Sequence, residues 1–581
     1  MKQAAALVLL LALTAAAAAG EGDREQAWER DRELALRRSH ETDRDKGHQY
    51  FSNDRDILAD SARDAEDEEH HDGDVDANVD PASAQLDEWK AKHKPRLLTT
   101  AAGAPVDVRS AFTLNSDLLD NPFFLDTINS ITNERIPNRE VNAKGSGAFG
   151  YFEVTNDVTK YTKAKLFEKV GKRTRVLARL GTSQSETGGS DLEPLGLRGL
   201  SVKFYTEEGN LDLLSIQIPV FFFKDPQLFT FTARALRRNP KTYLKDFTAV
   251  YDFLTLHPES LHSFMWMASE YGLPRGFRRM NAFPIHCYEI YNEKGEQFYV
   301  RFKFLSELGY DSFTLKEARE LGADDPDFFI RDLYNAIALG RAPAWRLHMD
   351  VLRDVHAVDF DPFDVTRLWG NGTYDTVELG RLVLDRNVDN HFAQVEQAAF
   401  NPNHLVPGIA GPRDQLFRGR ILAYTGAQIH RLGVNNHKIP VNCPLRAATY
   451  NRDGAGPVGD NERDAPVYFP NSFHGPAPRV EAAAPERLVV RHSARVDLQP
   501  ARDFYRLVLR RPAQRRRLVE NMAAHMQRVP RATRRPFLRL LRAVDQELAA
   551  RLHAALERRG RRHLPTLVDD VPRNTRDYSE L

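Results

Sequence analysis

The sequence predicts an α+β fold, with an antiparallel sheet followed by a helical region. Residues 176–180, 200–205 and 297–304 alternate or run apolar, as strands do, and the polar segments 207–210 and 292–295 resemble the turns between strands. Residues 329–339 have a helical pattern. In the last hundred residues, five apolar side chains recur every three or four positions, which predicts one apolar helical face: Phe537, Leu541, Val544, Leu548 and Leu552.

Length and composition indicate a large globular body with appendages. The chain has 581 residues, 42% of them hydrophobic, which is enough for a sizeable core. Its 81 basic and 81 acidic residues cancel. A neutral net charge gives no reason to expect nucleic acid or a membrane surface as a partner.

The amino terminus predicts secretion. Residues 1–20 begin with Lys2, continue with a short apolar run and end in small residues, as a cleaved signal sequence does. An uncleaved anchor is the alternative, but the run is short for a membrane span. Residues 21–84 are densely charged and predicted to be disordered or loosely helical. The carboxyl end, 579–581, carries an acid where a peroxisomal address would carry a base.

Two cysteines, Cys287 and Cys443, are too few for a disulfide scaffold, and two buried free thiols are the simpler expectation. Asn371 begins a glycosylation sequon, which fits a surface loop of a secreted protein.

Residues 477–581 form an arginine-rich region that is predicted to be helical. Arginines cluster at 515–517 and 558–559 and mark polar helix faces. A solvated face is the simplest interpretation, nucleic-acid binding is an alternative, and attraction to the acidic segment 64–76 is a third.

From about residue 86 to 476 the chain resembles the haem catalases. Residues 135–150 resemble the family's signature around its active-site histidine, and collinear matches follow. The other matching segments are 98–105, 147–155, 198–210, 359–364, 395–400, 439–444 and 468–473.

The resemblance implies a specific architecture. We expect the catalase fold, with an eight-stranded antiparallel β-barrel, a wrapping segment and a C-terminal helical region. It further implies a core spanning residues 85–476 that carries a haem site, a homotetramer, and hydrogen peroxide or another small oxidant as the reactant.

The proximal haem motif is intact. Arg420 and Tyr424 match the family's iron-ligand motif and, four residues apart, share one helical face. A free phenol titrates near about 10, and an adjacent guanidinium favours the phenolate that binds iron. The resemblance therefore makes Tyr424 the haem-iron ligand, whereas outside this frame the pair would be an ordinary helical contact.

Other haem contacts follow from the resemblance. Arg139, Arg179 and Arg431 match arginines that anchor the haem propionates, since a guanidinium fork suits a carboxylate. Each could instead belong to a structural ion pair. The pocket positions that match are Val141, Phe221, Phe222 and Phe229.

The distal site departs from the family. Asn142 stands where the family has its catalytic histidine, and an amide cannot titrate. Ile216 stands where the family has its partner asparagine, and Gly181 replaces a supporting serine. Gln217 adjoins Ile216 but points to the opposite face of a strand. We therefore expect peroxide decomposition to be severely reduced.

The family's nicotinamide-nucleotide pocket is also altered. His262 and Trp369 match, but Tyr271 replaces a basic residue and Asn371 replaces a histidine. NADPH is therefore not expected.

Three interpretations stay open. The first is a secreted catalase-family haem protein with little turnover. The second is an active catalase or peroxidase that uses another distal group, and the third is a haem-free structural pseudoenzyme. Intact Tyr424, Arg420 and Arg179 argue against the third.

Overall fold

The computed structural model describes residues 79–114, 118–182, 187–480 and 496–560. Contacts divide the chain into two units, Met1–Val79 and Asp80–Leu581, and the sheet and the helices described here belong to the second. The predicted signal sequence and almost all of the charged segment lie outside the described residues.

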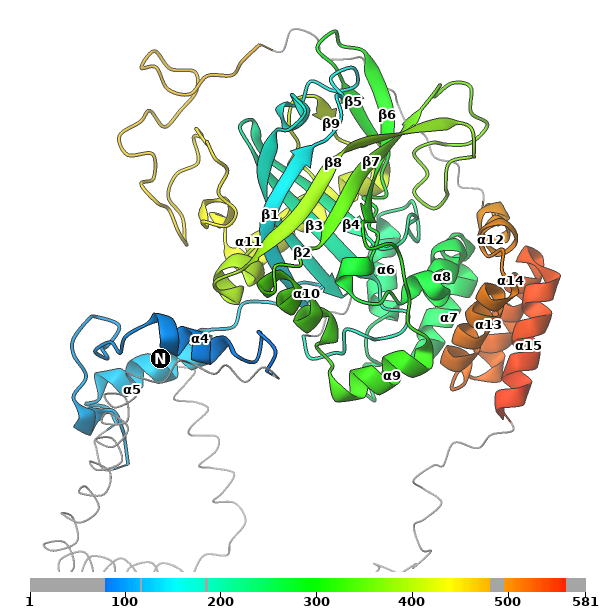
Figure 1. The fold of residues 1–581 in the computed structure, drawn as a ribbon, viewed down its shortest axis with the longest axis horizontal. Coiled ribbons are helices and arrows are strands. Elements are labelled where there is room, and N and C mark those ends of the chain that lie inside the picture. Colours follow the sequence, from blue (N-terminus) through cyan, green and yellow to red (C-terminus); the bar gives the residue numbers. More distant parts are fainter. Residues whose placement is uncertain (1–78, 115–117, 183–186, 481–495, 561–581) are drawn as a thin grey trace, which may run out of the picture. The chain divides into compact units, whose positions relative to one another are not determined.

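An antiparallel sheet forms the centre of the fold (Figure 1), with the strand order β4-β3-β2-β1-β8-β7-β6-β5-β9. Sequence neighbours β1 to β4 pair in succession, as do β5 to β8, and β1 pairs with β8. The strands are β1 Gly145–Val154, β2 Arg173–Thr182, β3 Arg198–Thr206, β4 Gly209–Ile216, β5 Tyr288–Tyr291, β6 Gln297–Ser306, β7 Ala344–Leu352, β8 Tyr374–Asn387 and β9 Ile409–Ala410.

The sheet curls around its main core. Leu200, Val202 and Phe204 alternate along β3 and are fully buried in this core. The side chains between them point outward, as the two-residue period of a strand requires. Isolated bridges from Ile216 to Phe283 and from Ala282 to Phe304 link the β4 edge to β6.

The α+β catalase fold is confirmed, and the predicted strands and turns at β2, β3, β6 and their connections are present. The sheet has nine strands instead of the expected eight, because the two-residue strand β9 pairs with β5 at one edge. Nothing in the alternation of the sequence marks so short a strand.

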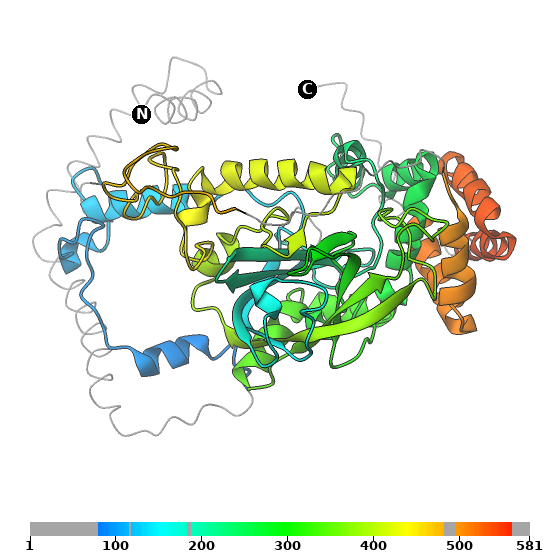
Figure 2. The same cartoon turned by 90° about the horizontal axis from the view of Figure 1, so that it is seen from above.

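A long helix lies along the outer face of the sheet. Helix α11, Gln415–Leu432, is drawn in yellow beside the strands in Figure 2. Its residues Tyr424 and Leu432 pack against an outer cluster that includes Leu177 of β2 and Leu214 of β4. Of the residues predicted to contact haem, Arg420, Tyr424 and Arg431 lie on α11 and Arg179 lies on β2.

The carboxyl region folds into helices that pack on α7 and α8. The single apolar helical face predicted from Phe537 to Leu552 is divided between two helices, because α14 ends at Val544. Asp545 is extended, and its carboxylate accepts from the Leu548 backbone N–H at 3.0 Å, which caps the start of α15. The five predicted apolar residues are all buried.

The remaining helices complete the described part of the chain. The arm before the sheet contains α4 Gln85–Lys92 and α5 Pro122–Asn133. The others are α6 Gln227–Ala235, α7 Phe247–Leu256, α8 Leu261–Ala268, α9 Leu315–Asp324, α10 Phe328–Ala338, α12 Gln499–Asp503, α13 Pro512–Met526, α14 Arg531–Val544 and α15 Gln546–Gly560.

Both cysteines are free, as expected, but only Cys287 is buried; Cys443 is exposed. None of the described helices has the length and apolar character needed to cross a membrane.

Candidate functional site

Helix α11 places Tyr424 beside Arg420. The helix begins where the Asp414 carboxylate accepts from the Phe417 N–H at 2.8 Å. One turn separates Arg420 from Tyr424, and Arg420 Nη2 donates to Tyr424 Oη at 3.3 Å. A guanidinium beside the phenol oxygen suits a tyrosine that binds a metal.

A buried relay holds Arg420 in place. Its Nη1 lies 2.8 Å from Nε2 of His286, and Nδ1 of His286 lies 2.9 Å from the Asp414 carboxylate. Burial lowers the pKa of His286, which keeps the ring neutral. A neutral ring that donates from Nδ1 to Asp414 can accept at Nε2 from Arg420. Although burial opposes its charge, the interaction with Tyr424 raises the pKa of Arg420.

Two of the three predicted propionate arginines pair with one carboxylate, and the third is held by a backbone carbonyl nearby. Arg139 Nη1 lies 3.1 Å and Arg431 Nη2 lies 2.6 Å from the oxygens of Glu396. Arg179, which is 5% exposed, donates to the Ala143 carbonyl at 3.0 Å. Burial and the neighbouring arginine lower the pKa of Arg139 to about 10, and burial lowers the pKa of Arg179 strongly.

This arginine cluster carries excess positive charge. Three guanidinium groups face the single carboxylate of Glu396, and Nε of Arg179 and Nη1 of Arg431 are buried without a hydrogen-bond partner. Buried donors are normally satisfied, so unpaired ones at a cationic cluster indicate a missing anion.

Asn142 lies at the end of the outer face, between two glycines. A Cβ placed on Gly199 would lie 3.2 Å from Asn142 Oδ1, and one on Gly181 would lie 3.5 Å from Asn142 Cβ. Asn142 has a left-handed backbone with φ of 56°, a conformation that asparagine tolerates better than most residues. Its Oδ1 is buried without a partner.

The other two positions that the resemblance predicts to be altered are linked to Asn142 through Gly199. Gly181 pairs with Gly199 across β2 and β3, and Gly199 pairs with Ile216 across β3 and β4. Gln217 points away, as predicted, because its Nε2 donates to the Gly272 carbonyl at 3.1 Å. No polar side chain is therefore supplied by position 216 or 217 on the Asn142 side.

The predicted pocket aromatics lie with Ile216. Phe221 and Phe229 pack against the same cluster as Ile216, which is distinct from the cluster that contains Tyr424. Phe222 is buried in that cluster and lies 5.4 Å from Phe221 between ring centroids. Val141 is partly buried next to Asn142.

The region that matches the nucleotide pocket is occupied by aromatic side chains. His262 Nδ1 lies 2.8 Å from the Thr366 carbonyl, and Nε2 accepts from Trp266 at 3.2 Å. The Trp266 ring lies 4.7 Å from Phe504 and 4.8 Å from Tyr271. Phe504 could not be expected here, because its contact with Trp266 joins segments far apart in sequence.

Glu396, His286 and Asp414 are the site residues that sequence reasoning missed. Glu396 stands inside the matching segment 395–400, which was the one signal that could have found it. Among the described residues, no group of three or more His, Cys, Asp or Glu side chains is arranged to hold a metal ion.

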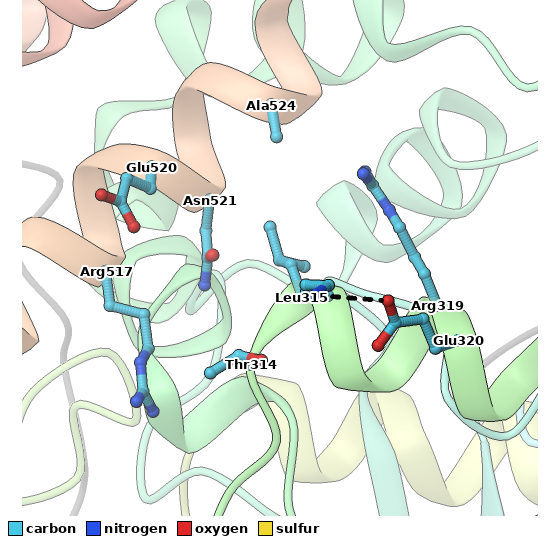
Figure 3. A pocket seen from close by; sticks show the side chains of 9 residues that line it. Thr314, Leu315, Arg319, Glu320, Arg517, Glu520, Asn521 and Ala524 are labelled. Atoms are coloured by element: carbon cyan, nitrogen blue, oxygen red, sulfur yellow. Dashed lines mark ion pairs between the residues drawn. The ribbon is translucent and has the colours of Figure 1, made fainter.

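A pocket of about 490 Å³ opens elsewhere, between α9 and α13 (Figure 3). Charges of both signs line it, including Arg319, Arg517 and Glu520, and Lys316 lies 3.6 Å from Glu320. It contains none of the predicted haem-site residues.

Comparison with known proteins agrees with this geometry. The catalase family profile matches residues 99–475, and the profile described as catalase-related immune-responsive matches residues 494–556. Pig catalase is 41% identical over 503 residues, which cover 83% of this chain and 94% of the relative. Catalase of Drosophila melanogaster is 42% identical over 471 residues, covering 78% and 92%.

Solved structures give the same result. A fungal catalase superimposes with a TM-score of 0.74 at 32% identity, covering 81% of this chain and 97% of that one. Catalase A of Saccharomyces cerevisiae has a TM-score of 0.73 at 32% identity, covering 80% and 99%. The chain belongs to the catalase family, whose members typically bind haem and decompose hydrogen peroxide.

Proposed function

We propose that this chain is a secreted, haem-binding member of the catalase family in which decomposition of hydrogen peroxide is severely reduced. The observation that carries the proposal is the combination of an intact proximal and anion-binding half with a distal half that has no titratable group at position 142.

The arginine cluster fits the two propionates of haem. Arg139, Arg179 and Arg431 outnumber Glu396 by two charges, and two of their buried N–H groups have no partner. Two carboxylates would balance that charge and satisfy those donors. Tyr424 would bind the haem iron, with the Arg420 guanidinium beside its oxygen. Phe221, Phe229 and Val141 would contact the macrocycle.

Haem supplies the iron chemistry that acts on peroxide in this family. The chain must supply a group that takes a proton from one peroxide oxygen and returns it to the other. Asn142 donates and accepts hydrogen bonds but cannot carry that proton, and Ile216 offers no polar group to orient the reactant. Slow peroxidase chemistry through another distal group is the second candidate; ferric haem with a tyrosine ligand retains reactivity.

The unpartnered arginine donors favour haem binding over a haem-free structural role. NADPH is not proposed as a cofactor. In the region that matches the family's nucleotide pocket, the Trp266 and Phe504 rings pack against each other, 4.7 Å apart between centroids. Secretion rests on residues 1–20.

A homotetramer is proposed on the family resemblance and on apolar surface. Leu422 of α11 is 77% exposed and is available for a contact between subunits. Light scattering on the holo-protein tests the assembly.

The absorption spectrum of the purified protein tests the proposal. A Soret band with bound iron near one per chain is expected. Its absence after expression with ample haem would refute the haem-binding part, whatever the turnover.

A further inference from the structure

Helix α14 carries a row of exposed arginines that the haem site does not use. Arg531, Arg535, Arg539 and Arg542 are all exposed. At 100° per residue they fall within a strip about 80° wide, and their Cα atoms extend over about 17 Å of the helix axis. This row is called the arginine stripe below.

The stripe lies almost opposite the buried face of the helix. Phe537, Leu541 and Val544 are at most 2% exposed. Around the helix axis, the mean direction of these three side chains is about 150° from the centre of the stripe. Leu538 and Leu540 are partly buried between the two faces. The helix is therefore fixed to the protein by its apolar side, and the arginines face solvent.

The stripe has no acidic counterpart in the described structure. From residue 521 to 544 the sequence contains six arginines and neither aspartate nor glutamate. Within the described residues, no carboxylate oxygen lies within 4.0 Å of the four stripe guanidiniums. Nearby arginines differ: Arg506 pairs with Asp545 and Glu547, and Arg551 pairs with Glu547.

The position of the stripe also opposes helix stability. Arg531 and Arg534 lie in the first turn of α14, where no acid stands and no side chain caps the helix. Positive charge is unfavourable at this end of a helix. Arg534 has a structural use, since it donates to the Val529 and Gln527 carbonyls. Arg531 and Arg535 have no such contact among the described residues, so local structure does not explain them.

We propose that the arginine stripe binds a linear sulfated polysaccharide. Four guanidinium forks in a row match anions repeated along a polymer, and arginine binds planar or tetrahedral oxyanions through paired donors. The choice of an extracellular polymer rests on the proposed secretion, whereas the binding itself can be tested on purified protein.

Two other polyanions fit the stripe less well. Anionic membranes hold amphipathic helices by burying an apolar face, and that face of α14 is already covered by the protein. Single-stranded nucleic acid is held by aromatic stacking, and among the described residues from 509 to 558 no Phe, Tyr, Trp or large aliphatic side chain is exposed. Only charge is presented.

The test measures binding of the purified full-length protein to heparin by calorimetry at several salt concentrations. In the test variant the four stripe arginines are replaced by glutamine. Removing one guanidinium–anion pair should lower the slope of log affinity against log salt by roughly one, so a fall of about two to four is expected. The control variant removes the same charge at four exposed sites elsewhere: Lys169, Lys241, Lys294 and Arg446.

The proposal holds if the affinity of the test variant falls at least about tenfold while that of the control variant stays within about threefold of wild type. Equal decreases in both would mean diffuse attraction, and no heparin binding by wild type would also overturn the proposal. Duplex DNA of matched charge and phosphatidylserine vesicles are parallel arms; equal or tighter stripe-dependent binding to either would overturn the choice of polymer. Circular dichroism checks folding, and a quadruple lysine variant should retain most of the affinity. Neither haem content nor secretion enters this readout.

Discussion

Restoring the two lost distal groups is the sharpest test of the proposed loss of turnover. The double variant Asn142→His, Ile216→Asn places an imidazole and an amide at the positions where the sequence resemblance predicts that the family has them. We expect its rate of oxygen release from peroxide to exceed that of the unmodified chain by about 100- to 10,000-fold, which is the usual contribution of a general acid–base.

The structure supports this choice of two positions. Gly199 lies between them, paired with Ile216, and Asn142 Oδ1 reaches to 3.2 Å from a Cβ placed on Gly199. Histidine is among the residues that tolerate the left-handed backbone at position 142, where φ is 56°. Ile216 is only partly buried, so its replacement costs about 1–2 kcal/mol of apolar burial, well within what a large domain tolerates.

The expected gain corresponds to about 2.7–5.4 kcal/mol of activation free energy. Both residues act on one step of the reaction. The gain in rate of the double variant should therefore differ from the product of the gains of the two single variants. An imidazole titrates near about 6.5, so the gained activity should fall as the pH drops below that value.

The assay is oxygen release per bound haem, which separates turnover from occupancy. Asn142→Gln with Ile216→Asn is the matched control, because glutamine adds length without a titratable group. Wild-type activity within about tenfold of pig catalase would refute the proposed loss. A haem-loaded double variant no faster than its glutamine control would mean that the altered residues are not what limits turnover.

Four further outcomes are expected. Tyr424→Phe should lower haem occupancy and shift the Soret band, and an unchanged spectrum would exclude it as the ligand. Mass spectrometry should find a mature chain that starts near Glu21, whereas a retained Met1 would contradict secretion. Burial lowers the pKa of His262 to about 4; stability should therefore be full above about pH 6.5 and fall by about 3 kcal/mol towards pH 4. Denaturant titrations should show a smaller loss in His262→Gln, and an identical loss would refute this assignment. Gly181→Ser should cost about 1–3 kcal/mol, because its Cβ would lie 2.8 Å from the Lys144 carbonyl; an unchanged melting temperature would show that the backbone yields.

Features set by local periodicity could be predicted from the sequence. Arg420 and Tyr424 meet because four residues make about one helical turn, and Gln217 turns away from Ile216 because strand side chains alternate. The relay from Arg420 through His286 to Asp414 could not be predicted, since it joins groups 134 and 128 positions apart. The broken helical face near Asp545 was missed because an apolar period continues across a cap.

If haem binds as proposed, the structure allows turnover to be lost while the haem contacts are kept. Arg179 and Gly181 stand two residues apart on β2, so one strand carries both an anion-binding group and a distal position. The Arg179 guanidinium is fixed by the Ala143 carbonyl, one residue after Asn142. Because that contact is made by the backbone, changing the side chain at 142 leaves it in place. Restoration at position 181 is limited by the same backbone, since a serine there would press on the Lys144 carbonyl and lie 3.0 Å from Arg179 Nη1. Restored catalysis should therefore be sought at positions 142 and 216, and position 181 should be left as glycine.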